Sequence, residues 1–363
     1  MSLENDDNKE PKEGIANDSP GDENQENSPQ VPESKPEPVI EPKDPNLEKA
    51  AEIRKKVNLI KSEIGKVIIG QGEMMEMMIA ALITNGHILI EGVPGIAKTL
   101  TSKLLAKSIS VDFSRIQFTP DLMPSDILGT TIFDMKQSEF YFKKGPIFNN
   151  IILIDEINRA PAKTQAALME VMEEEQVTID GKSYLMEKPF FVIATQNPVE
   201  QEGTYKLPEA QLDRFMFKLK SDYPKADEEV SMLMRFKEDF YGQKAESVNA
   251  AVDAAFLKEA RELVEKVYIK DDLIKYIAEI VGQTRNNSDL YLGASPRASL
   301  NILKAAKAVA LLAGRMFVTP DDIKKVLYPI LNHRLILSYE REIEGIPKKD
   351  VIEAIVRKVE IPR

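Results

Sequence analysis

The stretch HILIEGVPGIAKTL, residues 87–100, decides the fold. Its first four residues predict a short buried strand, and a helix is expected from about Lys98. Gly92, Lys98 and Thr99 have the spacing of a phosphate-binding loop, which is Gly, four residues, Gly, Lys and then Ser or Thr. Position 97, where the pattern has its second glycine, holds alanine. A strand before the loop and a helix after it are the context that such a loop requires.

The residue types in this loop suit the binding of phosphate groups. Gly92 and Gly95 let the backbone turn so that its N–H groups point at phosphate oxygens, and Pro94 stiffens the turn. Lys98 would neutralise the β and γ phosphates of a nucleotide, and the Thr99 hydroxyl would bind Mg²⁺. For the loop taken alone, a match by chance is the alternative.

Ala97 is the departure from the pattern. Position 97 adjoins the start of the helix, and we expect its φ to be that of an ordinary helical residue, for which alanine is the best choice. Ala97 would then leave phosphate binding intact, provided that the phosphates approach from the side of the backbone away from its methyl group.

Polar residues end two other apolar runs. The run at 151–160, IILIDEINRA, contains Asp155 and Glu156, and the run at 190–198, FFVIATQNP, contains Thr-Gln-Asn at 195–197. Ligands of open parallel sheets bind at the carboxyl ends of strands, so Asp155 is placed to hold Mg²⁺ and Glu156 to polarise an attacking water. A polar side chain of 195–197 would lie near the γ-phosphate or that water. The alternatives are a solvated strand end and a simple turn.

Strands and helices alternate from residue 67 to residue 219, which predicts an α/β fold with a parallel sheet covered on both faces. Segments 130–144 and 176–186 interrupt the alternation, and each looks like two strands around a polar turn. The second contains Asp180-Gly181, a strong hairpin signal. The five strand candidates of the sheet are 87–90, 113–118, 151–154, 190–195 and 215–219.

Beyond about residue 225 the periodicity is helical, which predicts a separate helical domain. Within it, Thr319, Pro320 and Asp322 predict an N-cap, a first helical position and a capping partner. At the other end, residues 1–46 hold 8 prolines and 13 acidic against 4 basic residues, which predicts a disordered tail that cannot bury a core. The predicted domains are therefore 1–46, 47–224 and 225–363.

Composition excludes several classes of site. The 363-residue chain has no cysteine, which rules out disulfides, thiol catalysis and cysteine zinc sites. His87 and His333 are far apart in sequence, so a structural role is expected for both. The formal charge of −11 lies mostly in residues 1–46, and the nearly balanced remainder argues against a nucleic-acid partner. No apolar run approaches the ~18–20 residues of a membrane span and the N-terminus resembles no secretory signal, so a cytoplasmic protein without membrane insertion is expected.

Six motifs, in order along the chain, make the sequence similar to the AAA+ ATPases and specifically to the MoxR family. They are GVPGIAKT, IQFTPDLMPSDILG, IILIDEINRAP, VIATQNP, LPEAQLDRF and GASPRA, and the resemblance covers about residues 47–360. The family itself carries alanine before the loop lysine, so Ala97 does not depart from it. The resemblance implies a P-loop nucleotide domain with a five-stranded parallel sheet, an all-helical lid domain, and assembly in rings that are usually hexamers.

The resemblance also implies a nucleotide site with ATP and Mg²⁺ as cofactors. VIIGQ at 67–71 is similar to the family's adenine-contacting loop, and Thr99 and Asp155 are the implied Mg²⁺ ligands. The implied nucleotide-contacting residues are Ile69, Gly70, Gly92, Val93, Pro94, Gly95, Ile96, Ala97, Lys98, Thr99 and Leu100.

Further positions match the family's catalytic residues. Glu156 is the water-activating acid of the Walker-B pair, and Asn197 is the sensor that positions water. Arg214, in LDRF, resembles the arginine finger that reaches the γ-phosphate of a neighbouring subunit. Arg297, in SPRA, resembles the second sensor on the lid, acting in cis or in trans, and Arg159 is another candidate interface residue.

The implied function is that of a ring-forming chaperone that uses ATP hydrolysis to remodel, mature or activate client protein complexes. The implied client or adaptor protein contains a von Willebrand factor A domain. One alternative is an AAA+ ATPase that remodels nucleic acid, which the nearly balanced charge disfavours. Another is an ATP-sensing interaction protein without turnover, which Glu156, Asn197 and Arg214 argue against. A metal-chelatase motor subunit is a near relative with the same mechanism.

Overall fold

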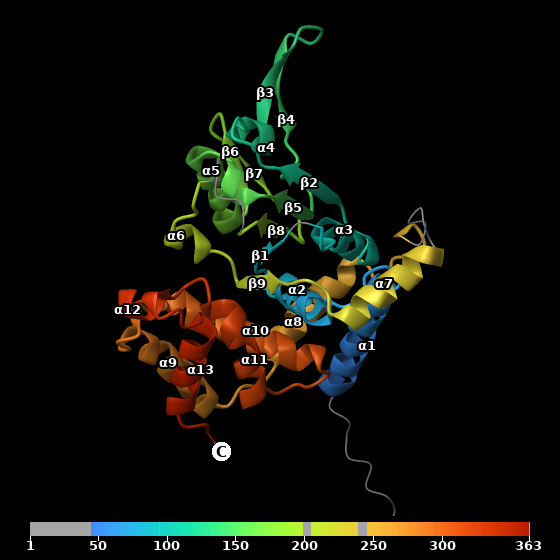
Figure 1. Cartoon of the computed structure of the whole chain (residues 1–363). Coiled ribbons are helices and arrows are strands. Elements are labelled where there is room, and N and C mark those ends of the chain that lie inside the picture. The colour runs from blue at the N-terminus through green and yellow to red at the C-terminus, as the bar shows by residue number, and fades with distance from the viewer. Residues whose placement is uncertain (1–44, 94, 199–204, 239–244, 363) are drawn as a thin grey trace, which may run out of the picture. The chain divides into compact units, whose positions relative to one another are not determined.

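The structure is a computed structural model (Figure 1). The residues that it describes are 45–93, 95–198, 205–238 and 245–362. They form one compact unit. The predicted acidic tail lies outside the described residues apart from Pro45 and Asn46, which begin helix α1 (Pro45–Gly65), and Pro94 of the loop lies outside them too.

Five parallel strands form the central sheet, which confirms the predicted α/β fold (Figure 1). Their order across the sheet is β2, β5, β8, β1, β9, and every neighbouring pair is parallel. Their carboxyl ends therefore share one edge, which is where a ligand of such a sheet binds. The strands are β1 (Ile88–Gly92), β2 (Phe113–Gln117), β5 (Ile151–Asp155), β8 (Phe191–Gln196) and β9 (Phe217–Ser221).

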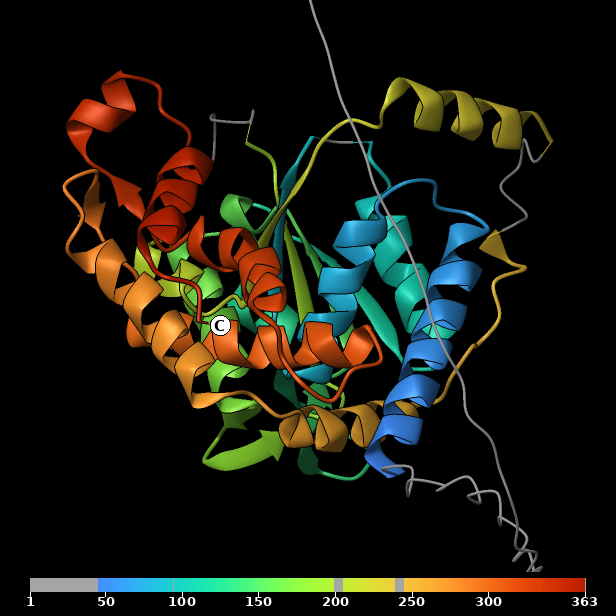
Figure 2. The ribbon, with the colours of Figure 1, turned by 90° about the horizontal axis from the view of Figure 1, so that it is seen from below.

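Different helices bury the two faces of the sheet. Successive side chains of a strand point to opposite faces, so Ile88 and Ile90 pack with α1, α2 and α3, whereas Leu89 packs with α5. The methionines of α2 are buried, as expected for a core helix. Figure 2 shows α1 and α2, in blue, beside the orange C-terminal helices, and α10 packs on both of them. The helices named here are α2 (Gly72–Ile83), α3 (Lys98–Ser108), α5 (Ala162–Glu174) and α10 (Pro296–Leu312).

Both predicted hairpins are present as antiparallel pairs outside the central sheet. Strands β3 (Gly129–Asp134) and β4 (Glu139–Lys144) follow the short helix α4 (Pro124–Leu128) and project from the body in Figure 1. Strands β6 (Gln176–Ile179) and β7 (Lys182–Leu185) follow α5. The positive φ values of Asp180 (51°) and Gly181 (78°) are those of the two-residue turn that the sequence predicts.

The part after β9 is mainly helical. The helical periodicity predicted beyond about residue 225 is confirmed, and Thr319 and Asp322 form the predicted capping box. The sequence did not indicate the short antiparallel pair β10–β11. None of the described helices combines the length and apolar character needed to cross a membrane. The remaining elements are η1 (Ile157–Arg159), α6 (Glu209–Leu212), α7 (Ala226–Glu238), α8 (Ala254–Lys266), α9 (Asp271–Arg285), β10 (Leu290–Leu292), α11 (Pro320–Leu331), β11 (Ile336–Leu337), α12 (Tyr339–Ile343) and α13 (Lys348–Lys358).

Candidate nucleotide site

The predicted phosphate-binding loop connects β1 to α3 at the carboxyl edge of the sheet. Gly92 ends β1, and a Cβ there would lie 2.4 Å from the carbonyl oxygen of Ser221 on β9, so only glycine fits this close approach. Gly95 has φ +86°, a conformation that glycine adopts without strain. The Nζ of Lys98 donates a hydrogen bond to the carbonyl oxygen of Gly92 at 2.6 Å, which folds the lysine back over its own loop.

The expectation of an ordinary φ at Ala97 was wrong. Ala97 is the N-cap of α3 and has φ 60° and ψ 21°, which is left-handed. The chain has to reverse direction between β1 and α3, and the second glycine of the pattern supplies the left-handed residue for that reversal. Alanine adopts it at a cost of about 1–2 kcal/mol. The helix itself begins at Lys98, where the sequence predicts it, and the left-handed residue lies directly before it.

The predicted adenine-contacting loop lies against the phosphate-binding loop. Gly70 has φ +73°, and a Cβ on it would lie 2.8 Å from Oε1 of Glu228, so α7 closes over this loop. Gln71 holds the two loops together, because its Nε2 donates to the carbonyl oxygen of Ile96 at 2.8 Å and its Oε1 accepts from the Thr101 hydroxyl at 3.2 Å. Sequence reasoning did not single out Gln71. Ile69, which was predicted to contact adenine, is half-buried next to Gly70.

Asp155 ends β5 with a buried carboxylate that a neighbouring cation already balances. Its Oδ2 accepts a hydrogen bond from Nε of Arg115 on β2 at 2.6 Å, and its Oδ1 accepts from the Thr195 hydroxyl at 3.2 Å. Lys98 interacts electrostatically with both acids. Burial lowers the pKa of Lys98, and the negative charges of Asp155 and Glu156 partly oppose that shift. The carboxyl edge of the sheet therefore combines a lysine with two acids.

Glu156, the next residue, is held by three neighbours. Its backbone N–H donates to the Thr195 hydroxyl at 3.0 Å, and its Oε2 accepts from Gln117 at 2.8 Å and pairs with Arg159 at 3.0 Å. Its φ of 57° is left-handed, and such strain in a residue other than glycine is concentrated at functional sites in proteins. Asn197, the predicted sensor, is buried directly after β8, one strand away.

The donor set fits one Mg²⁺ ion bound together with phosphates. Mg²⁺ prefers oxygen ligands and usually takes one or two carboxylates plus substrate phosphates rather than a cage made only of protein groups. Asp155 supplies a carboxylate, and Thr99 lies in the first turn of α3 after the loop. Among the described residues, no three His, Cys, Asp or Glu side chains form a metal-binding group of their own.

Arg214 and Arg297 lie together, at the opposite edge of the sheet from the loop. Both contact Glu173 near the end of α5, at 3.9 Å from Nε of Arg214 and 2.7 Å from Nη2 of Arg297, and Arg214 also donates to the carbonyl oxygen of Met169. Arg214 precedes β9, whereas Gly92 is level with the last residue of β9. Five strand residues at about 3.3 Å each separate the two edges by about 16 Å. The structure therefore does not bring these arginines to the phosphate-binding loop of their own chain.

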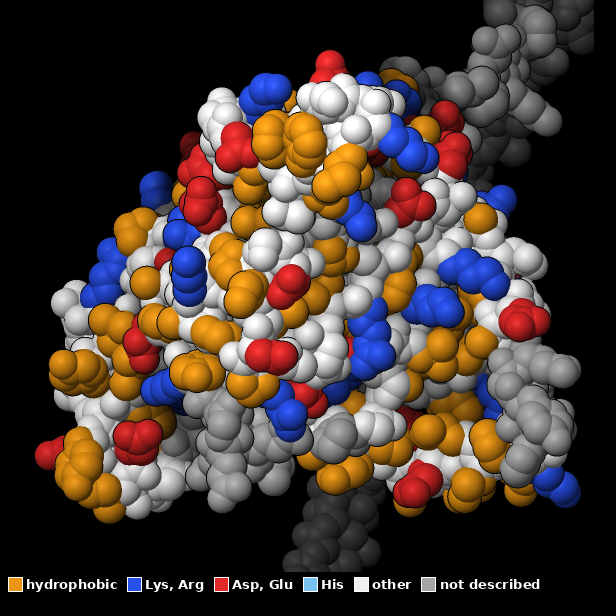
Figure 3. Space-filling view, turned by 90° about the horizontal axis from the view of Figure 1, so that it is seen from above, with side chains coloured by type: hydrophobic (Ala, Val, Ile, Leu, Met, Phe, Trp, Pro, Cys, Tyr) orange, Lys and Arg blue, Asp and Glu red, His pale blue; other side chains and the backbone are white. Residues whose placement is uncertain are grey.

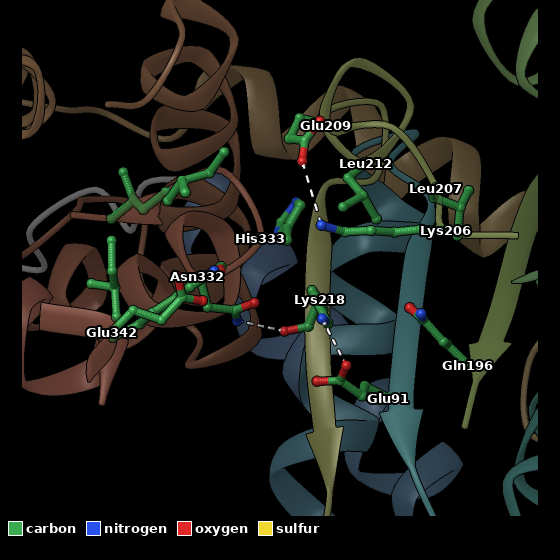
Figure 4. Close-up of a pocket in the computed structure, with 14 residues that line it drawn as sticks. Glu91, Gln196, Lys206, Leu207, Glu209, Leu212, Lys218, Asn332, His333 and Glu342 are labelled. Atoms are coloured by element: carbon green, nitrogen blue, oxygen red, sulfur yellow. Dashed lines mark hydrogen bonds and ion pairs between the residues drawn. The ribbon is translucent and has the colours of Figure 1, made fainter. Parts of the chain in front are cut away.

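A cavity of about 290 Å³ lies beside the site, between the ends of β1 and β9 and the C-terminal helices (Figure 4). An ion pair between Glu91 and Lys218, at 2.9 Å, lines it, and Nδ2 of Asn332 donates to the carbonyl oxygen of Lys218 at 2.9 Å. Glu91, which directly precedes Gly92, is thereby linked through Lys218 of β9 to Asn332, which directly follows α11.

Family comparisons agree with this architecture. A model of the ATPase family associated with various cellular activities (AAA) matches residues 87–217, and a model of the AAA lid domain matches residues 282–355. Chaperone MoxR1 of Mycobacterium tuberculosis is 41% identical over 310 residues, which cover 83% of this chain and 81% of that protein.

The chain belongs to the MoxR family of AAA+ ATPases. The chain is also similar to two other proteins. The protein YeaC of Bacillus subtilis is 48% identical over 82% of this chain and 92% of its own length. A crystal structure from Cytophaga hutchinsonii has 47% sequence identity, a TM-score of 0.81, and covers 87% of this chain and 98% of that one. The C-terminal helical part is accordingly the lid of a MoxR-family ATPase.

Sequence reasoning missed the polar residues of β2 that touch the acids. Arg115 and Gln117 alternate with the buried Ile116, so their side chains share one face of an edge strand. That alternation was visible in FSRIQF, but it is equally typical of a solvated strand. Only the pairing of β2 with β5, which places Gln117 opposite Asp155, shows that this face reaches the MoxR-family acidic pair.

Proposed function

We propose that this protein binds ATP with Mg²⁺ at the loop between β1 and α3 and hydrolyses it. The observation that supports this most strongly is that the loop, the acids after β5 and Asn197 after β8 emerge from three adjacent strands at one edge of the sheet. Membership of an ATPase family supports the same activity. Asp155 and Thr99 would hold Mg²⁺, which would supply positive charge to neutralise the phosphate groups.

The chain's own residues would act at stated positions. Lys98 neutralises the β and γ phosphates after it releases the carbonyl oxygen of Gly92. Asp155 and Thr99 would hold the metal, which would compete with the Arg115 guanidinium for the Asp155 carboxylate. Glu156 accepts the proton of the attacking water, and Asn197 orients that water. The hydrogen bond from Thr195 keeps Asp155 in place while its cation partner changes.

Hydrolysis would need a second subunit. Arg214 and Arg297 lie at the edge of the sheet opposite their own loop, so the ATP that they serve belongs to a neighbour in a ring, as in the hexamers usual for the family. Head-to-tail contacts of this kind close into rings. An arginine supplied to the transition state contributes about 10³–10⁵ to the rate of well-studied NTPases.

The ring would use ATP hydrolysis to remodel, mature or activate a client protein complex. The relative from Mycobacterium tuberculosis is named a chaperone, and this supports a chaperone role for the present chain. We propose a cytoplasmic protein whose client or adaptor contains a von Willebrand factor A domain, as is usual for the family. Figure 3 shows Asp and Glu as well as Lys and Arg side chains on the face that it draws, and the sequence beyond residue 46 is nearly balanced in charge, so nucleic acid is not the client that we propose.

A client trap tests the proposed function. Glu156→Gln should bind ATP and hold the client without hydrolysing the nucleotide, and Lys98→Ala should hold neither. The two variants are compared by ATP titration, by phosphate release, and by affinity capture from cell extract in ATP. Wild-type turnover by Glu156→Gln would show that another group activates the water.

A further inference from the structure

A buried arginine of the lid forms hydrogen bonds with the segment that contains Arg214. Arg334 lies just after α11 and exposes 1% of its side chain. Its Nε donates to Oδ1 of Asp213 at 2.6 Å, and its Nη2 donates to the carbonyl oxygen of Asp213 at 2.8 Å. The guanidinium thus binds both the side chain and the backbone of the residue directly before Arg214.

The same guanidinium also holds the backbone on the other side of Arg214. Nη2 donates to the carbonyl oxygen of Phe215 at 2.7 Å, and Nη1 donates to that of Met216 at 3.2 Å and that of Ile330 at 2.5 Å. All five donors of this rigid group therefore have acceptors, and most of the acceptors flank Arg214. A contact of this kind fixes the direction in which the intervening side chain leaves the backbone.

Asp213 reaches a second element of the lid with its other oxygen. Its Oδ2 accepts a hydrogen bond from the hydroxyl of Ser295 at 3.0 Å, and Ser295 is the N-cap of α10. Arg297 stands two residues further along α10 and shares Glu173 with Arg214. Asp213, Ser295 and Arg334, which we call the Asp213 latch, thus connect the segment that carries Arg214 to the lid helix that carries Arg297.

We propose that the Asp213 latch positions Arg214 and Arg297 as a pair, so that the lid of one subunit controls the arginines offered to the neighbouring subunit's ATP. This rests on the proposed function, in which these arginines act in trans. In this proposal the latch residues act through Arg214 and Arg297, so they are positioning residues and not catalytic ones. A lid that shifts carries α10 and the end of α11 with it, and the latch transmits that shift to the arginine pair.

The test uses Asp213→Asn, which keeps the shape of the side chain and removes its charge. Its matched control is Asp289→Asn, because Asp289 forms another lid ion pair, with Arg341 at 2.8 Å, and is similarly exposed, 25% against 23% for Asp213. We expect Asp213→Asn to lower kcat at least tenfold while the Kd for ATP stays within about threefold, and we expect the control to change neither. Ser295→Ala, a milder change, should lower kcat by a smaller factor.

Two further readouts separate positioning from general damage. If Asp213 acts through Arg214, the double variant Asp213→Asn, Arg214→Ala is no slower than Arg214→Ala alone. Mixed with Glu156→Gln subunits, which carry an intact latch, Asp213→Asn subunits should regain hydrolysis at their own loops. If the two substitutions together lower kcat by the product of their separate factors, the latch is overturned. It is also overturned if the melting temperature of Asp213→Asn falls together with its affinity for ATP.

The failures of the two proposals are distinguishable. If Arg214→Ala hydrolyses ATP at the wild-type rate, the arginine does not serve a neighbour, so the site shared between subunits and the latch are both overturned while ATP hydrolysis itself stands. If Arg214→Ala is inactive but Asp213→Asn and Ser295→Ala both turn over at the wild-type rate, the proposed function stands and the latch alone is overturned.

Discussion

Replacing Ala97 by glycine tests the backbone of the loop directly. At φ 60° and ψ 21° the alanine is left-handed, which costs an L residue about 1–2 kcal/mol and glycine almost nothing. Glycine also adds freedom to the unfolded chain, which offsets about 0.4–1 kcal/mol of that gain. We therefore expect Ala97→Gly to raise the free energy of unfolding by about 0.5–1 kcal/mol.

Ala166 provides the matched control for this change. It is exposed in the middle of α5, where the backbone is helical, so Ala166→Gly should lower the free energy of unfolding by about 1 kcal/mol. Denaturant unfolding of the nucleotide-free variants measures both changes as shifts of opposite sign in the midpoint. The affinity of Ala97→Gly for ATP should stay within about threefold, or about 0.7 kcal/mol, because the strain acts on the free and the bound loop alike.

Midpoints that move in the same direction for the two variants would refute the left-handed backbone at position 97. A tenfold gain in ATP affinity for Ala97→Gly would instead show that the methyl group obstructs the phosphates.

The remaining predictions concern the site and one buried histidine. Lys98→Ala should abolish ATP binding, and Glu156→Gln should keep it; ATP titration of both variants checks this, and tight binding by Lys98→Ala would contradict it. Arg115→Gln should strengthen Mg²⁺ binding to the ADP complex severalfold, because the ion no longer competes with a guanidinium for Asp155; calorimetric titration with Mg²⁺ measures it, and an unchanged affinity would count against that competition. Burial lowers the pKa of His87 from 6.5 to about 4, so the unfolded chain takes up this proton at higher pH than the folded chain does. Stability should therefore be full above about pH 6.5 and fall by up to about 3 kcal/mol towards pH 4, and His87→Gln, melted across that range, should lack this part of the slope.

The sheet and its site edge were predictable because they depend on short-range patterns. Apolar runs such as 151–154 become central strands since a parallel sheet is buried on both faces. The polar residues that end those runs then lie at one edge whatever the detailed packing, which is why Asp155 and the polar segment 195–197 are predictable at that edge from the sequence.

What the sequence could not show depends on single backbone angles and on distant pairs. The left-handed φ of Ala97 is invisible in a pattern that places the helix start only to within a residue. The bond between Asp213 and Arg334 joins residues 121 positions apart, and each looks like an ordinary surface charge in its own segment. Arg115 likewise appears as a solvated residue of an edge strand until β2 is paired with β5.

The shared active site is tested most directly by mixing two inactive variants, Arg214→Ala and Glu156→Gln. Each should bind ATP and hydrolyse it poorly alone, and labelled subunits should first confirm that mixed rings form. In an equal mixture about a quarter of the interfaces combine an intact Glu156 with a neighbour's intact Arg214, so about a quarter of the wild-type rate should return if each interface fires alone. Mixed rings that stay as inactive as the separate variants, or a monomer with full ATPase activity, would contradict a site built from two subunits.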